Sequence, residues 1–234
     1  MRRLSIVASL ALFAACGPKP NPRLAPLAHA KLEAGVGLGD VKLGEMTLGP
    51  FHDRFGAGFV TFVASDDAGL ELIFEEGEIA FLFQFESMAW TDEEGMAIRR
   101  ASRDLGAYLD AYPQRRSLPL TSITVRVDDD KEATFYQGRL AEGVALFDPF
   151  LESAGRVGIV GEGALPLIAG LNPNNPRETA SFPKRGLILY GARDPHPGRP
   201  SLVTRMTVFL PKPWGEATDE IEDSGEAEDA DAAD

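Results

Sequence analysis

The chain has 234 residues, with 23 lysine and arginine residues against 36 aspartate and glutamate residues, for a net charge of −13. No basic patch of the kind that nucleic acids require is present, so we expect no nucleic-acid partner. The single cysteine, Cys16, excludes an internal disulfide, so the fold must depend on its hydrophobic core.

The N-terminus has the composition of a targeting segment. Arg2 and Arg3 precede an apolar run from Leu4 to Ala15. This run is too short for a membrane-spanning helix, which needs about 20 apolar residues. A positive start, a short apolar centre and small residues at the end are typical of a secretory signal.

The end of that run, Leu12-Phe13-Ala14-Ala15-Cys16, resembles the lipobox of bacterial lipoproteins. In that family the peptide is cut before the cysteine, which is then lipidated on its sulfur and its amine. The resemblance therefore implies a signal peptide at residues 1–15 and a membrane anchor on Cys16. Gly17 implies sorting to the outer membrane in a cell with two membranes, with the domain facing the periplasm or the cell surface. An ordinary secretory signal, or an apolar strand with an incidental cysteine, is the alternative.

Composition divides the remaining chain into three parts. Residues 16–35 are rich in proline and predict an extended linker. Residues 216–234 contain ten acidic residues and no basic ones, which predicts a disordered tail. Residues 36–215 have the length of one globular domain, or of two small ones in contact. The tail is interpreted either as a solubilising end or as an acidic arm for a basic partner or divalent ions.

Strand patterns dominate the central part. Runs of β-branched, aromatic and alternating residues predict strands at residues 58–63, 70–74, 79–85, 121–127, 133–136, 186–190 and 202–210. The segment 75–78 contains Gly77 and predicts a hairpin between the second and third of these strands. The last two strands are expected to pair with each other. We therefore expect a mainly antiparallel sheet.

Helix signals are fewer. Thr91 and Glu94 form a possible capping box, and apolar residues recur at helical spacing from there to Tyr112, before Pro113. A shorter helix is predicted from Pro50 to Gly56, and a third near residues 147–154 or 164–171. The predicted fold class is α+β with one clear helix and a few short ones. Residues 44–85, 105–137 and 163–210 form a candidate repeat of three α-β-β units.

The stretch from Leu43 to Gly56, LGEMTLGPFHDRFG, is similar to the start of small outer-membrane lipoprotein modules of the β-barrel-assembly type. In those modules a helix precedes a small antiparallel sheet. The resemblance implies a binding or scaffolding module and transfers no functional residue.

No catalytic constellation, cofactor motif or metal motif is recognised. His52 beside Asp53 is interpreted as a surface pair on a helix, and residues 128–130, three aspartates, as a turn rather than a calcium site. Phe81, Phe83 and Phe85 share one strand face and are assigned to the core, with a ligand groove as the alternative. The sequence thus favours a lipid-anchored binding or structural module of the cell envelope, with an envelope protein as a possible partner. An envelope hydrolase with a dispersed site, or a carrier of small apolar ligands, is the alternative; the oligomeric state stays open.

Overall fold

The structure is a computed structural model of the whole chain. It describes residues 22–56, 58–62, 69–76, 79–86, 91–100, 104–127, 137–160, 167–169, 177–192 and 200–211. Cys16, residues 128–136, His196 and the tail at residues 216–234 lie outside the described residues. The expectations for lipidation, for the aspartate turn and for tail disorder therefore stay predictions.

The fold is α+β and is built mainly of antiparallel sheet, as the sequence predicts. A small sheet has the order β1-β2-β3 and a large eight-stranded sheet has the order β4-β5-β6-β7-β11-β10-β9-β8. All named strand pairs are antiparallel. The strands are β1 Leu32–Glu33, β2 Gly37–Leu38, β3 Val41–Lys42, β4 Phe59–Phe62, β5 Leu70–Glu76, β6 Ile79–Phe85, β7 Leu120–Val127, β8 Leu167–Ala169, β9 Arg177–Phe182, β10 Leu187–Ala192 and β11 Leu202–Phe209.

The described helical elements are α1 Leu48–Phe55, α2 Asp92–Arg100, α3 Leu105–Ala111 and α4 Phe150–Val160, with short 3-10 turns η1 Ala25–Leu27, η3 Pro113–Ser117 and η4 Pro183–Arg185. Helix α1 begins two residues before the predicted start, so Pro50 lies in the first turn, where its missing N–H removes no helical bond. Helix α4 overlaps the first of the two predicted places for a third helix. The second place is wrong in part, because residues 167–169 form strand β8.

The long helix predicted from Thr91 to Tyr112 is two helices, α2 and α3. Asp104 ends the continuity because its side chain caps α3, accepting a hydrogen bond from the Ala107 N–H at 3.0 Å. The predicted capping box is half formed. The Thr91 hydroxyl accepts from the Glu94 N–H at 3.2 Å, but the Glu94 carboxylate turns to Arg115 and Tyr108 instead of back to Thr91.

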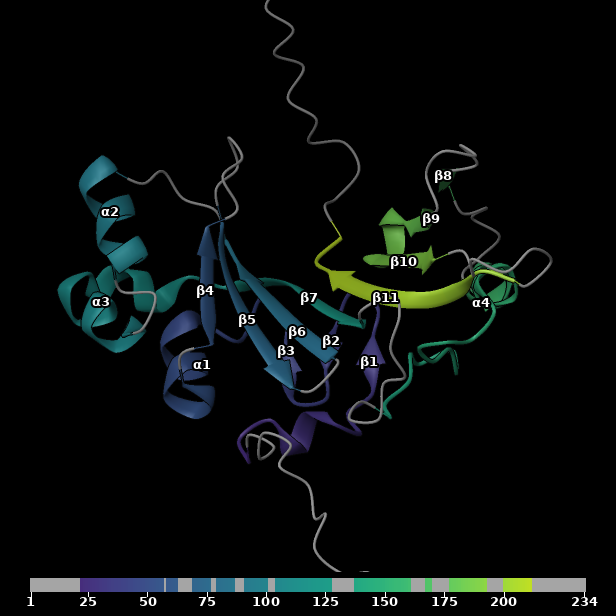
Figure 1. The fold of residues 1–234 in the computed structure, drawn as a ribbon, viewed down its shortest axis with the longest axis horizontal. Helices are drawn as coiled ribbons and strands as arrows, with labels where there is room; N and C mark the ends of the chain where they lie inside the picture. Colours follow the sequence, from purple (N-terminus) through teal and green to yellow (C-terminus); the bar gives the residue numbers. More distant parts are fainter. Residues whose placement is uncertain are drawn as a thin grey trace, which may run out of the picture.

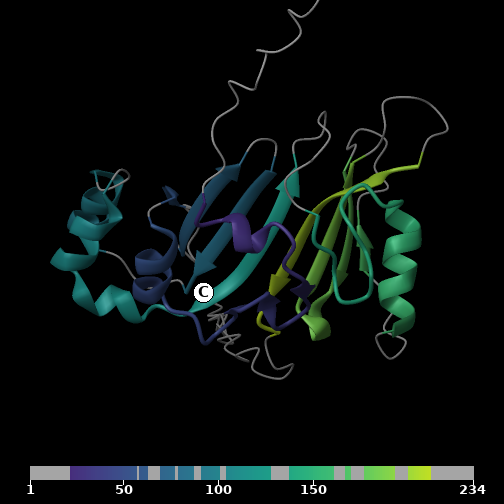
Figure 2. The same ribbon diagram turned by 90° about the horizontal axis from the view of Figure 1, so that it is seen from below.

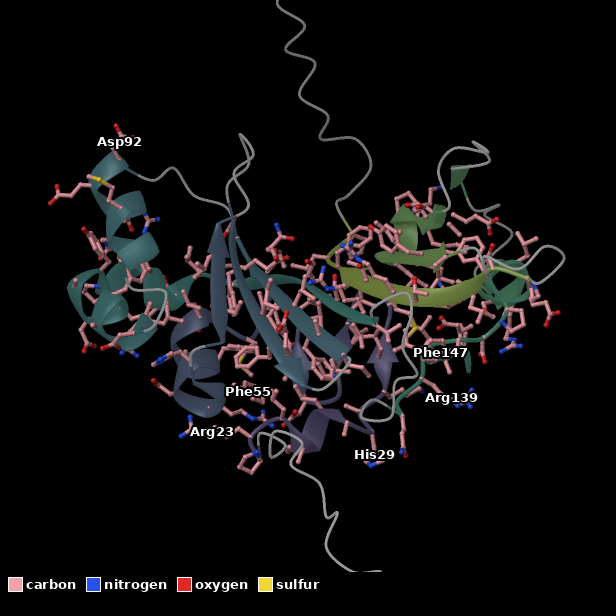
Figure 3. All side chains as sticks on the ribbon, in the orientation of Figure 1. Arg23, His29, Phe55, Asp92, Arg139 and Phe147 are labelled. Carbon is pink, nitrogen blue, oxygen red and sulfur yellow. The ribbon has the colours of Figure 1, made fainter. Side chains whose placement is uncertain are left out.

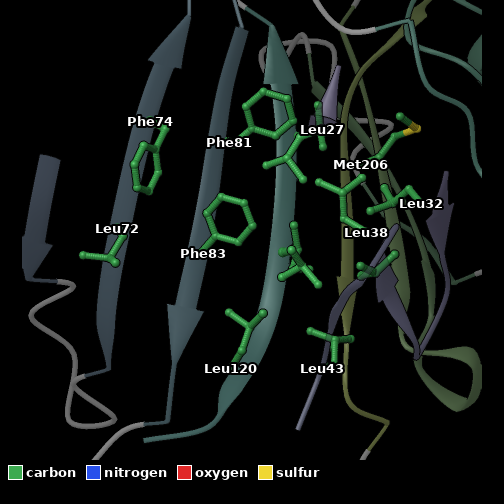
Figure 4. Close-up of a cluster of buried hydrophobic side chains, with 14 of the residues drawn as sticks. Leu27, Leu32, Leu38, Leu43, Leu72, Phe74, Phe81, Phe83, Leu120 and Met206 are labelled. Atoms are coloured by element: carbon green, nitrogen blue, oxygen red, sulfur yellow. The ribbon is translucent and has the colours of Figure 1, made fainter. Parts of the chain in front are cut away.

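The core lies on one face of the large sheet, which we call the covered face. Phe51 of α1 packs against Phe83 and Phe85 with ring centroids 4.6 and 5.4 Å away. Phe81, Phe83 and Phe85 are all fully buried, which confirms their assignment to the core. Leucines of the small sheet and Met206 of β11 complete the same cluster (Figure 4). Rings and aliphatic side chains fill this space.

The N-terminal segment is part of the domain from Leu24 onward. Leu24 and Leu27 are each 1% exposed and Leu32 is fully buried. The main chain at Leu32 also exchanges hydrogen bonds with Arg139 and Ala141. Figures 1 and 2 show this segment and the small sheet crossing the large sheet on the side of α1. The folded part therefore begins before residue 36, and the predicted linker is shorter than 16–35.

One arrangement of helix and strands occurs twice. Helix α1 is followed along the chain by β4, β5, β6 and β7, and α4 by β8, β9, β10 and β11. In the sheet order, β4 and β8 take the two edges, while β7 and β11 pair at the centre. The unit is thus one helix with four strands, occurring twice. It replaces the candidate repeat of three α-β-β units.

The main-chain connections of the two units match residue by residue. The Leu48 N–H at the start of α1 donates to the Leu118 carbonyl at 2.9 Å, and the Phe150 N–H at the start of α4 donates to the Ser201 carbonyl at 2.8 Å. Isolated bridges join Thr47 to Pro119 and Pro149 to Leu202. Both units also carry an irregularity at the same place, before Phe85 in β6 and before Gly191 in β10. Corresponding positions can therefore be compared directly.

Candidate functional site: the open face of the sheet

The second face of the large sheet lies opposite the face on which the described α1 and α4 pack. We call it the open face. Its central residues Ala80, Leu82, Thr124 and Thr207 are nevertheless at most 8% exposed. Helix α4 packs on the covered face, because a Cβ built on Gly191 would meet the Phe150 ring at 2.8 Å. Helix α1 packs there through Phe51. Figure 1 shows α1 and the small sheet on one side of the large sheet and α4 beside its β10 and β11 half.

Strand register arranges the open face in rows that run across the sheet. In the first row, β6, β7, β11 and β10 contribute Leu82, Thr124, Thr207 and Ile188. In the second row the same strands contribute Ala80, Arg126, Arg205 and Tyr190. In the third, β6, β7 and β11 contribute Gln84, Ser122 and Phe209. The face is therefore polar at its centre, in contrast with the apolar covered face.

The axis that relates the two units passes through the first row. Thr124 and Thr207 are corresponding residues and lie opposite each other on the central strands. Their hydroxyl oxygens are 2.8 Å apart and both side chains are buried, so the two hydroxyls satisfy each other. Rows two and three lie on either side of this pair and exchange places under the repeat.

The third row is hydrogen-bonded from β6 to β7, and β5 adds the half-buried Glu71 to it, opposite Gln84. Ser122 donates its hydroxyl hydrogen to the Gln84 side-chain oxygen at 3.0 Å, and the Thr121 hydroxyl donates to the Gln84 carbonyl, also at 3.0 Å. The positions that correspond to Gln84 and Ser122 in the second unit are Tyr190 and Arg205. There the Arg205 guanidinium lies over the Tyr190 ring, 4.4 Å from its centroid. The first unit thus has a hydrogen-bonded pair at these positions, and the second unit has a cation–π pair.

Arg126 and Arg205 lie directly opposite each other on β7 and β11. Cβ atoms at such positions are about 5 Å apart, and like charges there destabilise a sheet. Both side chains are half-buried, and the Nε atom of each is buried with no hydrogen-bond partner. We call Arg126, Arg205 and Tyr190 the cationic row. Two half-buried arginines on neighbouring strands are suited to binding carboxylates, which match the donor geometry of a guanidinium.

Glu75 is the carboxylate that β5 contributes to the same row, opposite Ala80. Two strand spacings separate β5 from β7, about 10 Å, and Glu75 is exposed. No ion pair joins it to either arginine among the residues that the structure describes. The positive charge of the cationic row is therefore not neutralised by a carboxylate of the described residues.

A second polar cluster is buried among α2, α3 and η3. The Arg115 Nε and Nη2 atoms donate to the two Glu94 carboxylate oxygens at 2.6 and 2.7 Å, and the Tyr108 hydroxyl donates to Glu94 Oε1 at 2.8 Å. The Arg115 hydrogen bonds hold the pKa of Glu94 below its ordinary value. Burial, followed by the Glu94 hydrogen bond, raises the pKa of Tyr108. All three residues are at most 6% exposed, so this cluster fastens the helices together.

The other residues considered from the sequence lie apart from the open face. His52 Nδ1 is 3.5 Å from Asp53 Oδ1 on α1, and Arg116 Nη1 is also 3.5 Å from Asp53 Oδ1. His29 lies within the N-terminal segment and is exposed (Figure 3). Among the described residues, no group of three histidine, cysteine or acidic side chains could hold a metal ion. No described helix is long and apolar enough to cross a membrane.

Sequence reasoning missed the cationic row. Alternation along residues 121–127 puts Thr124 and Arg126 on the face of the strand opposite to Ile123 and Val125, and the structure agrees. The pairing of Arg126 with Arg205, however, joins residues far apart in the chain and depends on β7 lying next to β11. No family model, curated protein or solved structure matches the chain. The order α1, then antiparallel β4–β6, is common to many α+β folds and identifies no family.

Proposed function

We propose that this protein is a lipid-anchored cell-envelope protein that acts as a binding module through the open face of its sheet. The single observation that carries the binding role is the difference between the two faces. One is filled by helices and the small sheet, and the other carries a cationic row at its centre. The lipobox that ends at Cys16 supports the envelope location.

The position of the first described residues adds a geometric constraint. Leu24 is already in the core. The eight residues from Cys16 to Leu24 can span at most about 28 Å. A lipid on Cys16 would therefore hold the domain close to the headgroups, where it can bind other envelope components. This range is shorter than the linker that the sequence predicts.

The filled core favours a binding module over an apolar-ligand carrier. Phe51, Phe55, Phe74 and Phe83 contact one another with ring centroids 4.6 to 6.4 Å apart, in the space between α1 and the sheet. A ligand groove at this place would have to displace these rings. A hydrolase gains no support from the Glu94 cluster, because its buried carboxylate is already held by Arg115 and Tyr108.

Two measurements test the proposal. Cys16→Ala should release the protein from membranes, whereas Ser5→Ala, in the same signal segment, should leave it bound. A Cys16→Ala protein that stays with membranes after a high-salt wash would show that the lipid anchor is wrong.

The binding role is tested separately with the lipidated protein purified in mild detergent. We expect a co-purifying envelope component in near-equal amount, and its loss when Arg126 and Arg205 are both replaced by glutamine. If the double variant retains that component, the open face is not the binding surface. Hydrolysis of a generic ester, glycoside or peptide substrate that depends on one polar residue would support the enzyme alternative.

A further inference from the structure

We infer that the acidic C-terminal tail of this chain, residues 216–234, docks on the cationic row of the open face. The tail would place its carboxylates on Arg126 and Arg205. The inference rests on the proposed use of the open face and does not depend on the lipid anchor.

Charge is the first argument. Arg126 and Arg205 oppose each other without a carboxylate partner among the described residues, and the tail has ten acidic residues and no basic ones. A carboxylate between two guanidiniums accepts hydrogen bonds from both and removes their repulsion. In the third row, Ser122 corresponds to Arg205 and Phe209 corresponds to Arg126, and both are neutral. An acidic segment should therefore bind the cationic row in preference to these positions.

Chain continuity is the second argument. The last described residue, Pro211, follows β11, the strand that carries Arg205. From Phe209 back to Arg205 the distance along the strand is about 13 Å. The seven residues from Phe209 to Glu216 can span up to about 24 Å. The first acidic residues of the tail can therefore return to the row.

Because the tail is covalently joined to β11, even a weak contact is sufficient for it to occupy the cationic row. A segment joined to its site by a short flexible connection has an effective concentration in the millimolar range. Two partly exposed arginine–carboxylate contacts are each weak. In solution they would bind a free peptide poorly, but in the same chain they can occupy the row for much of the time. The tail would then compete with any acidic partner for the open face.

The experiment uses the full mature chain with a photo-reactive phenylalanine analogue at Thr179. This half-buried residue of β9 is the neighbour of Tyr190 in the same row. The cross-linked peptides are identified by mass spectrometry. A second sample carries the analogue at Arg139, which lies on the side of the N-terminal segment (Figure 3). We expect cross-links from position 179 to residues 216–234 and few from position 139.

Substitutions make the test specific. Arg126→Gln or Arg205→Gln should lower the tail cross-link about threefold each, and the double variant about tenfold. Raising the salt concentration from 0.05 to 0.5 M should lower it similarly. Arg139→Gln is the matched control, since Arg139 is exposed and donates to the Gly143 carbonyl; it should change nothing. A tail whose acidic residues are replaced by glutamine and asparagine leaves the folded domain intact and should also lose the cross-link.

Several outcomes would overturn the inference. Tail cross-links of equal strength from positions 139 and 179, or cross-links that survive in the double variant, would show a non-specific tail. Cross-links between heavy-labelled and light-labelled chains would assign the row to the tail of a second copy. Cys16→Ala should leave the cross-link unchanged, so failure of the lipid anchor and failure of tail docking give different results.

Discussion

The first and second units have the same main-chain plan and different side chains. At the start of the helix, Leu48 of the first unit corresponds to Phe150 of the second, and both are fully buried. Phe51 corresponds to Ser153, and Phe85 to Gly191. The first unit thus fills its core with rings from both helix and sheet. In the second, one ring from the helix lies over a glycine of the sheet.

The difference shows what fixes this fold. The hydrogen bonds at the helix starts and the irregularities in β6 and β10 are shared, although the volumes of the side chains around them are exchanged. Cores tolerate such exchange when the total volume is kept. The first unit also has an insertion, because α2, α3 and η3 lie between β6 and β7. The corresponding connection in the second unit, between β10 and β11, has no described helix.

The largest expected effect comes from Phe51→Ala. Phe51 is fully buried against Phe55, Phe74, Phe83 and Phe85, so its removal leaves a cavity in the first unit. We expect a loss of about 3–5 kcal/mol in the free energy of unfolding, measured by urea denaturation. Ser153→Ala is the matched change in the second unit. The buried Ser153 hydroxyl has no hydrogen-bond partner, so this variant should be neutral or slightly more stable. Equal losses in the two variants would contradict the comparison.

Glu94→Gln tests the insertion. It removes the carboxylate that pairs with the buried Arg115, and breaking a buried pair in this way costs about 3–5 kcal/mol. Because the pair joins α2 to η3 and both lie at the edge of the sheet, we expect hydrogen exchange to speed up in α2, α3 and η3 and to stay slow in β6 and β7. Asp92→Asn, at the exposed start of α2, is the control (Figure 3). Faster exchange throughout the sheet would show that the insertion is not a separate unit of stability.

Acid should weaken the same interaction without any substitution. The pKa of Glu94 is lower in the folded protein than its ordinary value of 4.5, so the unfolded chain takes up this proton at a higher pH than the folded one. The contribution of Glu94 to stability is therefore fully present above about pH 4.5 and is lost as the pH falls through its folded pKa. Urea denaturation of the wild type and Glu94→Gln from pH 7 downward should show the difference between them shrinking only at that acid end. A difference that shrinks already near pH 6 would assign the effect to another group.

Gly191→Ala tests whether the small residue at position 191 compensates for the large Phe150 ring that lies over it. Its methyl group would lie 2.8 Å from two ring carbons of Phe150, so we expect a loss of about 1–3 kcal/mol. Phe150→Leu restores the residue type found at the corresponding Leu48 and should recover part of the loss when combined with Gly191→Ala. Thermal unfolding of the two single variants and the double variant measures the coupling. Additive losses would show that the ring and the glycine do not compensate each other.

Local patterns predicted most of the elements, and long-range pairing decided what they could not. The runs at residues 70–74, 79–85 and 121–127 became β5, β6 and β7 because alternation and β-branching are visible in a short window. The break between α2 and α3 was missed because apolar spacing continues through it, although Asp104 is a capping residue. The small sheet was missed because each of its strands has two residues. The cationic row depends on the β7–β11 register, which no local pattern contains.

The smallest expected effect lies at the axis between the two units. Thr124→Val leaves the Thr207 hydroxyl buried without its partner, 2.8 Å away in the wild type, and should cost about 1 kcal/mol. The variant with both threonines replaced by valine removes both polar groups together and should recover most of that loss, because neither hydroxyl is then unsatisfied. Double-mutant analysis of urea denaturation gives the coupling energy between the two positions. A coupling near zero would mean that the hydroxyls are satisfied by water. The junction of the two units would then depend on the strand pairing and the apolar side chains of the covered face.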